Sequence, residues 1–561
     1  MPQIDTRIQQ LDVLPFTKYY MEQLNLYALF DKYIPNTNGL DINPAQVLCM
    51  MVLNIVNARK PLYRIEEWLE NYLDGVTEER IKAKKYNDDR LARTLDMLFE
   101  ADRGSLMAEV SKMAIDVHAL ELEKVHNDTT SITFSGAYEI PCDGAVQPMR
   151  GFNKDHRPDS KQIVFGLNIS EDGHVPLSFQ LYDGNQADVS THQPNWDGLR
   201  ELLGTDDFIY VADSKLCALD TLSHIADAGG LFITVMPRNF KEVKGFLDRV
   251  REGEDVQWQH RYEKPNSRKK TANITYRIHE GESCRDGYRI LWVYSSAKAS
   301  QEQKARESQL KKAEEELDKI STKLNTYNLK TRDQIEIRVE KLLVRCHRFM
   351  RVDILERRQI ERVKLGPGRP GVNSHYEERE IVTYQLQYSR DKEAITKAQR
   401  TDGLFPLVDN TALPPVDVLK TYKKQPYLEK RFHTAKSVLE VAPVFIKTPR
   451  RIEGMMFLYF ISLMLVSLME RNIRRQMENE NIDSLPIRPS GLKTKAPTWE
   501  NLQHFFRNVH LAMVVQGRHI LSTSVKGVSP LHALLLQLLK VPRSIYDEIT
   551  EQWWMFAKPN G

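Results

Sequence analysis

The stretches VHNDTTSITF (residues 125–134) and FIYVAD (residues 208–213) decide the fold. The first alternates and the second is a short apolar run, so each predicts a β-strand. Asp128 lies inside the first stretch, and Asp213 ends the second. A carboxylate in a sheet strand is costly unless something offsets its charge, and α/β sheets place functional groups at strand ends. Both aspartates are therefore candidate functional residues.

The two stretches taken alone leave structural alternatives open for both aspartates. Asp213 could cap a helix that begins at Ser214 or Lys215. Asp128 could be an exposed strand residue.

The neighbouring segments predict a mixed sheet. KQIVFGLNIS (161–170) is rich in strand-forming residues, and VPLSFQLY (175–182) follows an Asp-Gly step that is typical of a hairpin. Residues 191–204 and 214–230 read as helices, and LFITVMP (231–237) reads as a buried strand. The order β-β-β-α-β-α-β predicts an α/β fold with a mixed sheet flanked by helices.

The rest of the chain divides into regions of different pattern. We predict an N-terminal helical domain at 1–115, the first part of the sheet core at 116–237, and an insertion of antiparallel strands at 238–410. A second part of the core follows at 411–480, and a C-terminal helical region at 481–561. Inside the insertion, Leu310, Ala313, Leu317, Ile320 and Leu324 form a coiled-coil-like seam, and Thr331 with Gln334 forms a capping box. These features predict a helical hairpin at about 298–363, which could contact DNA, dimerise or only pack.

Composition sets few limits on function. The chain has 561 residues and a net charge of +3, so any nucleic-acid surface must come from local clustering. Five separated cysteines favour a reducing cytoplasm, and the N-terminus lacks the pattern of a signal peptide. The apolar run Met455 to Met469 is shorter than the roughly 20 residues of a membrane span, and we expect a buried helix there.

A third acid lies in the segment YKKQPYLEKRFHTAK (422–436). Glu429, His433 and Lys436 fall on one predicted helix face, beside an apolar stripe that includes Leu428 and Phe432. Taken alone, such a glutamate is usually a solvated surface acid.

Together, these residues resemble the catalytic domain of DDE transposases, with its RNase H-like core. The chain is most similar to the insertion-sequence-four superfamily, whose Y-x2-R-x3-E-x6-K signature matches Tyr422, Gln425, Glu429 and Lys436 in spacing. The contexts HNDTTS, GFNKDHRPDSKQIVFGL and GNQAD also resemble this family, over roughly residues 120–475. Two departures are Gln425 in place of the arginine and Pro426 within the signature, so we expect the helix to start at Pro426.

The resemblance implies a cut-and-paste transposase in which Asp128, Asp213 and Glu429 hold two Mg²⁺ or Mn²⁺ ions, suited to carboxylate oxygens. It implies DNA partners (transposon ends and target) and a homodimer in the DNA complex, with no membrane. The implied DNA contacts come from the same helix and the loop before it: Tyr422, Gln425, Lys430, Arg431, His433 and Lys436.

Other functions and other sources of DNA contact remain open. Lys436 could be a surface lysine, and His433 a plain helix-face histidine. Local basic clusters at Lys244, 268–270, 357–358 and 450–451 could contact the DNA backbone or be solvated charge runs. A metal-dependent nuclease on the same fold, or a catalytically inactive DNA-binding protein, are the competing functions.

Overall fold

The computed structural model describes most of residues 4–549 in two compact units, Met1–Thr234 with Lys420–Gly561, and Val235–Leu419. Each unit is described by itself. Between residues 4 and 549, the description leaves out 38, 72–82, 135–137, 139–142, 152–159, 187, 267–272, 284–286, 327, 345, 366, 368, 370, 372–374, 441–445, 447 and 517–518.

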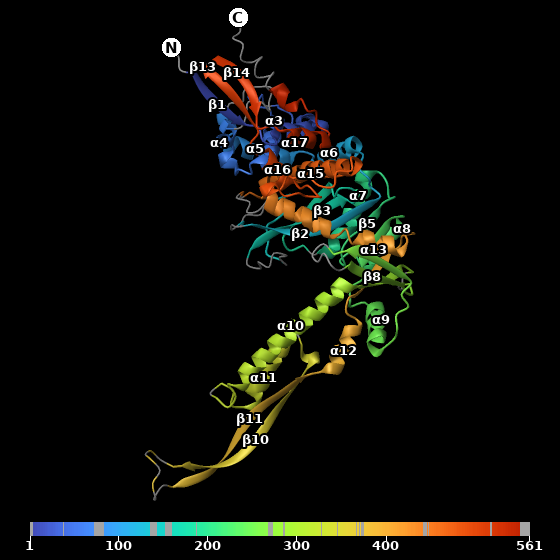
Figure 1. The fold of residues 1–561 in the computed structure, drawn as a ribbon, viewed down its shortest axis with the longest axis vertical. Helices are drawn as coiled ribbons and strands as arrows, with labels where there is room; N and C mark the ends of the chain where they lie inside the picture. The colour runs from blue at the N-terminus through green and yellow to red at the C-terminus, as the bar shows by residue number, and fades with distance from the viewer. Residues whose placement is uncertain are drawn as a thin grey trace. The chain divides into compact units, whose positions relative to one another are not determined.

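A mixed sheet lies at the centre of the first unit (Figure 1). Its strands run in the order β4-β3-β2-β5-β6, in which β2, β3 and β4 are antiparallel while β5 and β6 continue parallel to β2. The predicted mixed α/β fold and its element order are confirmed. The elements are β2 (Lys124–Phe134), β3 (Lys161–Ser170), β4 (Pro176–Tyr182), α7 (His192–Leu203), β5 (Ile209–Val211), α8 (Leu219–Asp227) and β6 (Leu231–Val235).

The predicted hairpin joins β3 to β4 through a tight turn. Gly173 has a φ of 70°, which side-chain-bearing residues rarely adopt. A Cβ at this position would also lie only 2.5 Å from the side chain of Arg471. The Asp-Gly step is therefore required both by the turn and by the close approach of that arginine.

Helices from both ends of the chain complete the first unit. The long helix α15 (Pro449–Asn479) packs against the N-terminal helices α3 and α5. The other helices of this unit are α1 (Leu14–Gln23), α2 (Leu26–Tyr33), α3 (Pro44–Asn57), α4 (Ile65–Asn71), α5 (Asp88–Glu100), α6 (Arg103–His118), α14 (Pro426–His433), α16 (Trp499–Phe506) and α17 (Pro530–Leu538). Helix α13 (Pro415–Tyr422) runs into this unit across its boundary with the second.

Helix α15 contains the apolar run Met455 to Met469, which is buried as predicted. Among the described residues it is the one helix long and apolar enough to cross a membrane, and 89% of its apolar window is buried inside the protein. It is the central helix of a core.

The helical prediction for the two ends of the chain is wrong in part. Strand β1 (Ile4–Gln10) pairs with β13 (His510–Gln516), which pairs with β14 (His519–Lys526). Most of β1 is exposed, so it lacks the apolar alternation by which a strand is recognised. Its stability comes from a partner strand some 500 positions away in the sequence, which local pattern does not reveal.

The second unit contains the predicted antiparallel strands in the order β12-β9-β8-β7. These are β7 (His260–Pro265), β8 (Asn273–Glu280), β9 (Arg289–Ser295) and β12 (Leu404–Asp409), with helices α9 (Lys241–Glu252) and α12 (Lys392–Arg400). The helices α10 (Ser296–Ser321) and α11 (Arg332–Leu343) form the predicted hairpin, and Thr331 with Gln334 caps α11.

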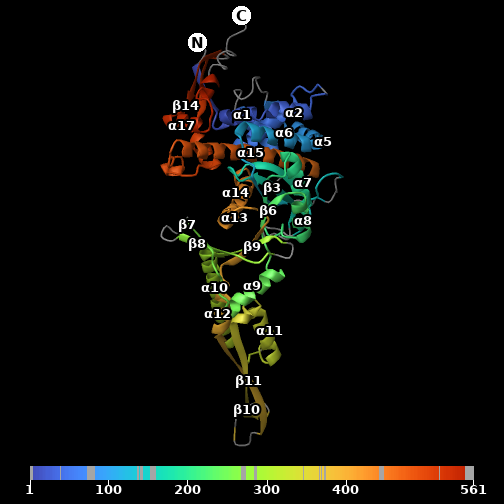
Figure 2. The same ribbon diagram turned by 90° about the vertical axis from the view of Figure 1, so that its right-hand side faces the viewer.

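The predicted helical stretch to residue 363 is wrong beyond Leu343. Residues Met350–Lys364 form the strand β10, which pairs residue by residue with β11 (Tyr376–Arg390). Figures 1 and 2 show this two-stranded ribbon starting beside α10 and α11 and continuing past them. The long-range pairing, and not the local sequence, decides the strand conformation here.

Candidate functional site

Asp128 lies on β2, and Asp213 lies two residues beyond the end of the neighbouring strand β5. Strand β2 runs parallel to β5 with His126 opposite Val211, and each aspartate lies two residues further along its strand direction. Neighbouring strands are about 4.8 Å apart, so the continued register brings the two carboxylates together at one end of the sheet.

Local hydrogen bonds orient both carboxylates. Oδ1 of Asp128 accepts from the Thr129 N–H at 2.7 Å, and Oδ1 of Asp213 accepts from the Lys215 N–H at 2.9 Å. Residues 214 and 215 form a turn, and α8 begins only at Leu219. Asp213 is therefore not the helix cap that the sequence left open.

Tyr422, at the end of α13, shares the environment of the two aspartates. Burial raises the pKa of its hydroxyl well above the ordinary value, and the negative charges of Asp213 and Asp128 raise it further. The signature tyrosine thus lies close enough to feel both carboxylates, and its hydroxyl stays protonated at neutral pH.

Gln425 fastens the start of α14 to β2. Its Nε2 donates to the carbonyl oxygen of Asn127 at 2.7 Å, and its Oε1 lies 3.0 Å from Nδ1 of the fully buried His126. Because His126 and Asp128 are two residues apart in one strand, their side chains share a face of the sheet. Asp128 therefore points to the face that α14 covers.

Glu429 lies on α14 one turn beyond Gln425, and its side chain is exposed. At the end of the same helix, Phe432 packs against Phe165 of β3 with ring centroids 6.3 Å apart. The helix starts at Pro426 as predicted, because proline is favoured at the first helical position. Glu429 is thus carried on a helix docked over the strand of Asp128.

The turn between β3 and β4 contacts the residues just before α14. The Glu171 carboxylate accepts from Lys424 Nζ at 2.8 Å and lies 3.7 Å from Nε2 of His126. Burial alone would raise the pKa of Glu171, but the nearby His126 imidazole, the hydrogen bond from Lys424 and the charges of Lys424 and Lys124 lower it to about 2. The turn and the start of α14 therefore form one charged cluster.

Arg431 is a structural residue, which corrects its expected role in DNA binding. Only 4% of it is exposed, and its guanidinium donates to the carbonyls of Gly173 and His174 and to Glu470 of α15, at 2.7–2.8 Å. A side chain with these buried partners is not available to a phosphate.

The other residues expected to bind DNA have different surroundings. Lys430 is exposed, with Nζ 4.3 Å from the ring centroid of Tyr427, and His433 is exposed in the last turn of α14. Lys436 is half-buried in the π-helical segment Thr434–Val438, where the wider turn rotates it away from its straight-helix position. Gln425 is engaged with β2, so it acts inside the protein.

The basic clusters are mostly paired where the structure describes them. Arg450 and Arg451 form ion pairs with Glu100 and Asp96 of α5. Residues 268–270 lie outside the described residues.

Asp128, Asp213 and Glu429 do not form a single set of metal ligands in the structure. No three His, Cys, Asp or Glu side chains within the described part of the chain lie close enough together to hold a metal ion. Asp128 lies on β2, Asp213 follows the neighbouring strand β5, and Glu429 is exposed on α14, which packs on β2. Carboxylates of this kind are hard oxygen donors, which fit Mg²⁺ or Mn²⁺.

Sequence reasoning missed His126 and Glu171. His126 lies two residues before Asp128, so its place on the same strand face was a usable signal. Glu171 lies in a turn, and nothing in the local sequence links it to residue 424.

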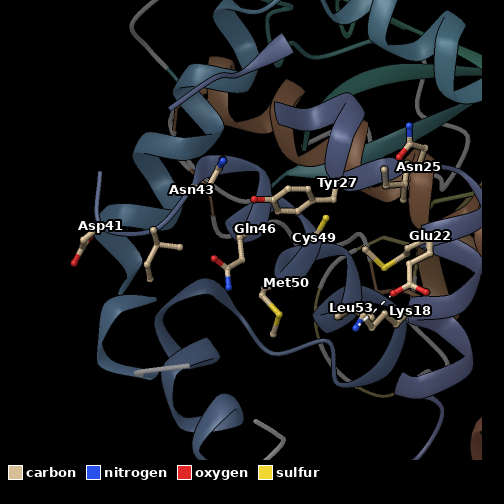
Figure 3. Close-up of a pocket in the computed structure, with 13 residues that line it drawn as sticks. Lys18, Glu22, Asn25, Tyr27, Asp41, Asn43, Gln46, Cys49, Met50 and Leu53 are labelled. Atoms are coloured by element: carbon tan, nitrogen blue, oxygen red, sulfur yellow. Dashed lines mark ion pairs between the residues drawn. The ribbon is translucent and has the colours of Figure 1, made fainter. Parts of the chain in front are cut away.

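A cavity of about 620 Å³ lies among α1, α2 and α3, away from the acids (Figure 3). Polar and apolar side chains line it in similar measure, including Tyr27, Gln46 and Met50. Figure 3 shows the Lys18–Glu22 ion pair at one side of the cavity. These residues bring no cluster of acids or other catalytic groups together.

Comparison with known proteins gives limited results. A family model described as a domain of unknown function, DUF4277, matches residues 6–112. No curated protein matches the chain significantly. A solved structure of the piggyBac transposase synaptic complex with hairpin DNA is 8% identical, covers 98% of this chain and 87% of its own, and has a TM-score of 0.37.

Proposed function

We propose that this chain is a DNA transposase that uses Asp128, Asp213 and Glu429 to hold two divalent metal ions. The observation that carries the proposal is the parallel pairing of β2, which contains Asp128, with β5, which ends two residues before Asp213, together with the hydrogen bond that links the start of the Glu429 helix to the residue before Asp128. The strand order β4-β3-β2-β5-β6 is also the one that an RNase H-like core has. Tyr422 of the resembled signature is affected by the charges of both aspartates, and Glu429 is carried on α14, which packs on β2; both support the proposal.

The chain's own residues would prepare a DNA phosphate for displacement. Asp128 and Asp213 present carboxylates for Mg²⁺ or Mn²⁺, and rotation of the exposed Glu429 side chain would complete the set. When bound, the ions activate water and stabilise the leaving oxygen. The protonated hydroxyl of Tyr422 lies within the electrostatic influence of both aspartates, and Lys430 and Lys436 would offer positive charge to the DNA backbone.

The deciding experiment is Mg²⁺-dependent cleavage of DNA that carries the terminal repeats flanking the gene. We expect Asp128→Asn, Asp213→Asn and Glu429→Gln each to abolish cleavage and to leave DNA binding in a gel-shift assay intact. Asp207→Asn, at an exposed aspartate outside the site, is the matched control and should cleave normally. Normal cleavage by Glu429→Gln would remove the third ligand from the proposal.

Transfer of a pre-cut DNA end to a target separates a transposase from a nuclease. A transposase joins the free 3′ end to target DNA, whereas a nuclease releases cut ends only. Absence of both cleavage and joining in wild type, with retained DNA binding, would favour a catalytically inactive DNA-binding protein.

A further inference from the structure

The ribbon of β10 and β11 extends well beyond its packed base. At the base, Met350 and Leu386 belong to the apolar cluster of α10 and α11. From Leu355 to Val363, no residue of β10 is buried, and Ile360 is 73% exposed. Ten strand residues from 355 to 364 span about 33 Å. A two-stranded ribbon is marginally stable alone, and its open edge is a template for another strand.

The charge of this free half argues against DNA as its partner. Residues 355–364 and 376–380 contain five basic and five acidic side chains. Arg358, Arg362 and Arg379 are already paired with ribbon glutamates at 2.7–3.2 Å. DNA-binding arms need an excess of unpaired positive charge, so a protein surface is the better fit.

In the free half of β10, two charged residues whose side chains the structure describes lack such a pairing. Arg357 and Glu361 have no ion-pair partner among the described residues, whereas Arg358, Arg362 and Arg379 each have one. Glu361 lies opposite Arg379 in the ribbon, but the guanidinium of Arg379 contacts Glu377. Arg357 and Glu361 are four residues apart with Gln359 midway between them, on the same face of the strand.

This spacing makes the edge of β10 complementary to itself. If two copies of the strand pair antiparallel with Gln359 opposite Gln359, then Arg357 of each copy lies opposite Glu361 of the other. The same register places Leu355 opposite Val363. Directly opposed residues of unlike charge stabilise an antiparallel pair, as do opposed apolar residues.

The neighbouring registers are unfavourable. A shift by one residue in one direction opposes Arg357 to Arg362, and a shift in the other opposes Glu356 to Glu361. Like charges directly opposite each other destabilise a strand pair. Among these three registers, only the one centred on Gln359 opposes unlike charges without also opposing like charges.

We propose that the free edge of β10 pairs with the same edge of a second copy of this chain, about a twofold axis at Gln359. The two ribbons then form a four-stranded sheet that joins the two subunits. This inference is independent of the catalytic assignment, because it concerns the assembly of the protein and not the acids.

Cysteine cross-linking of the full chain tests the register. Gln359→Cys should form an intersubunit disulfide under mild oxidant, because opposed residues in a strand pair have Cβ atoms about 4.5–5.5 Å apart. Asp353→Cys is the matched control on the same face, outside the proposed charge pairs, since its two copies would lie about 40 Å apart along the strands and out of reach. Wild type under the same oxidant gives the background of the natural cysteines. Equal cross-linking of both variants, or none at position 359, would overturn the proposal.

Charge exchange tests the interface without cysteine. Arg357→Glu and Glu361→Arg should each weaken self-association at least tenfold in sedimentation equilibrium, and the double variant R357E/E361R should restore it. Arg338→Glu makes the same charge change at an exposed position of α11 and should have no effect. Loss of DNA binding in Arg357→Glu but not in Glu361→Arg, with unchanged self-association, would assign the ribbon to nucleic acid instead.

Discussion

The side-chain amide of Gln425 donates a 2.7 Å hydrogen bond to the backbone carbonyl of Asn127. This hydrogen bond links Gln425, which directly precedes the helix of Glu429, to Asn127, which directly precedes Asp128. Where the resembled signature has an arginine, this chain has a glutamine that positions the helix of Glu429 against the strand of Asp128.

Loss of the hydrogen bond between Gln425 and Asn127 should affect both the stability of the fold and the cleavage activity. Gln425→Ala leaves a strand carbonyl and His126 without their partner, so we expect the free energy of unfolding to fall by about 1–3 kcal/mol. Cleavage should fall by roughly tenfold to a hundredfold, because small misplacements of catalytic groups are costly. Urea denaturation and cleavage rates measure the two effects. Gln301→Ala, exposed on α10, should change neither, and equal stability of Gln425→Ala and wild type would contradict the role.

Arg431 should behave as a buried structural residue. Arg431→Met removes three hydrogen bonds and leaves the buried Glu470 without this partner, at a cost of about 3–5 kcal/mol. The measurement is the midpoint of urea denaturation, with Lys112→Ala, an exposed change, expected within about 0.5 kcal/mol of wild type. A loss of DNA affinity at unchanged stability would instead support the phosphate contact that the sequence suggested.

The Glu171 cluster should make stability depend on pH in the acid range. Because the folded pKa is about 2, below the ordinary 4.5, the stabilisation is present above pH 4.5 and is lost as the pH falls toward 2. Glu171→Gln should lower stability at pH 7 and flatten its fall between pH 5 and pH 2. Denaturation curves across this range provide the measurement. The exposed Glu201→Gln should keep the wild-type slope, and an unchanged slope in Glu171→Gln would argue against the cluster.

Metal binding should be visible without catalysis. Mg²⁺ or Mn²⁺ should raise the melting temperature of wild type, since a ligand at 100 times its dissociation constant stabilises the folded state by about 2.7 kcal/mol. Asp128→Asn and Asp213→Asn should abolish the shift. Glu429→Gln should keep part of it, because Glu429 is exposed on α14 and the described residues hold no set of three ligands. A full shift in Asp213→Asn would place the ions elsewhere, and Asp207→Asn serves as the unaffected control.

The sequence predicted those features that local chemistry controls. The order of elements from 125 to 237 follows from changes in hydrophobic period, and the β3–β4 hairpin follows from its Asp-Gly step. The start of α14 at Pro426 and the cap of α11 at Thr331 follow from the preferences of single residues at helix ends. Each depends on neighbours within a few positions.

Long-range pairing decided the rest. Strand β1 exists because of β13, and β10 exists because of β11, although neither has a strand pattern of its own. Glu429 and Arg431 are two residues apart on one helix, yet one is exposed and the other buried, because only the latter faces the β3–β4 turn and α15. The sequence by itself determined which acids are candidates and the fold that carries them. Only the tertiary structure decided that the strand of Asp128 pairs with the strand that ends before Asp213 and that Gln425 points inward, since both depend on contacts between segments distant in the chain.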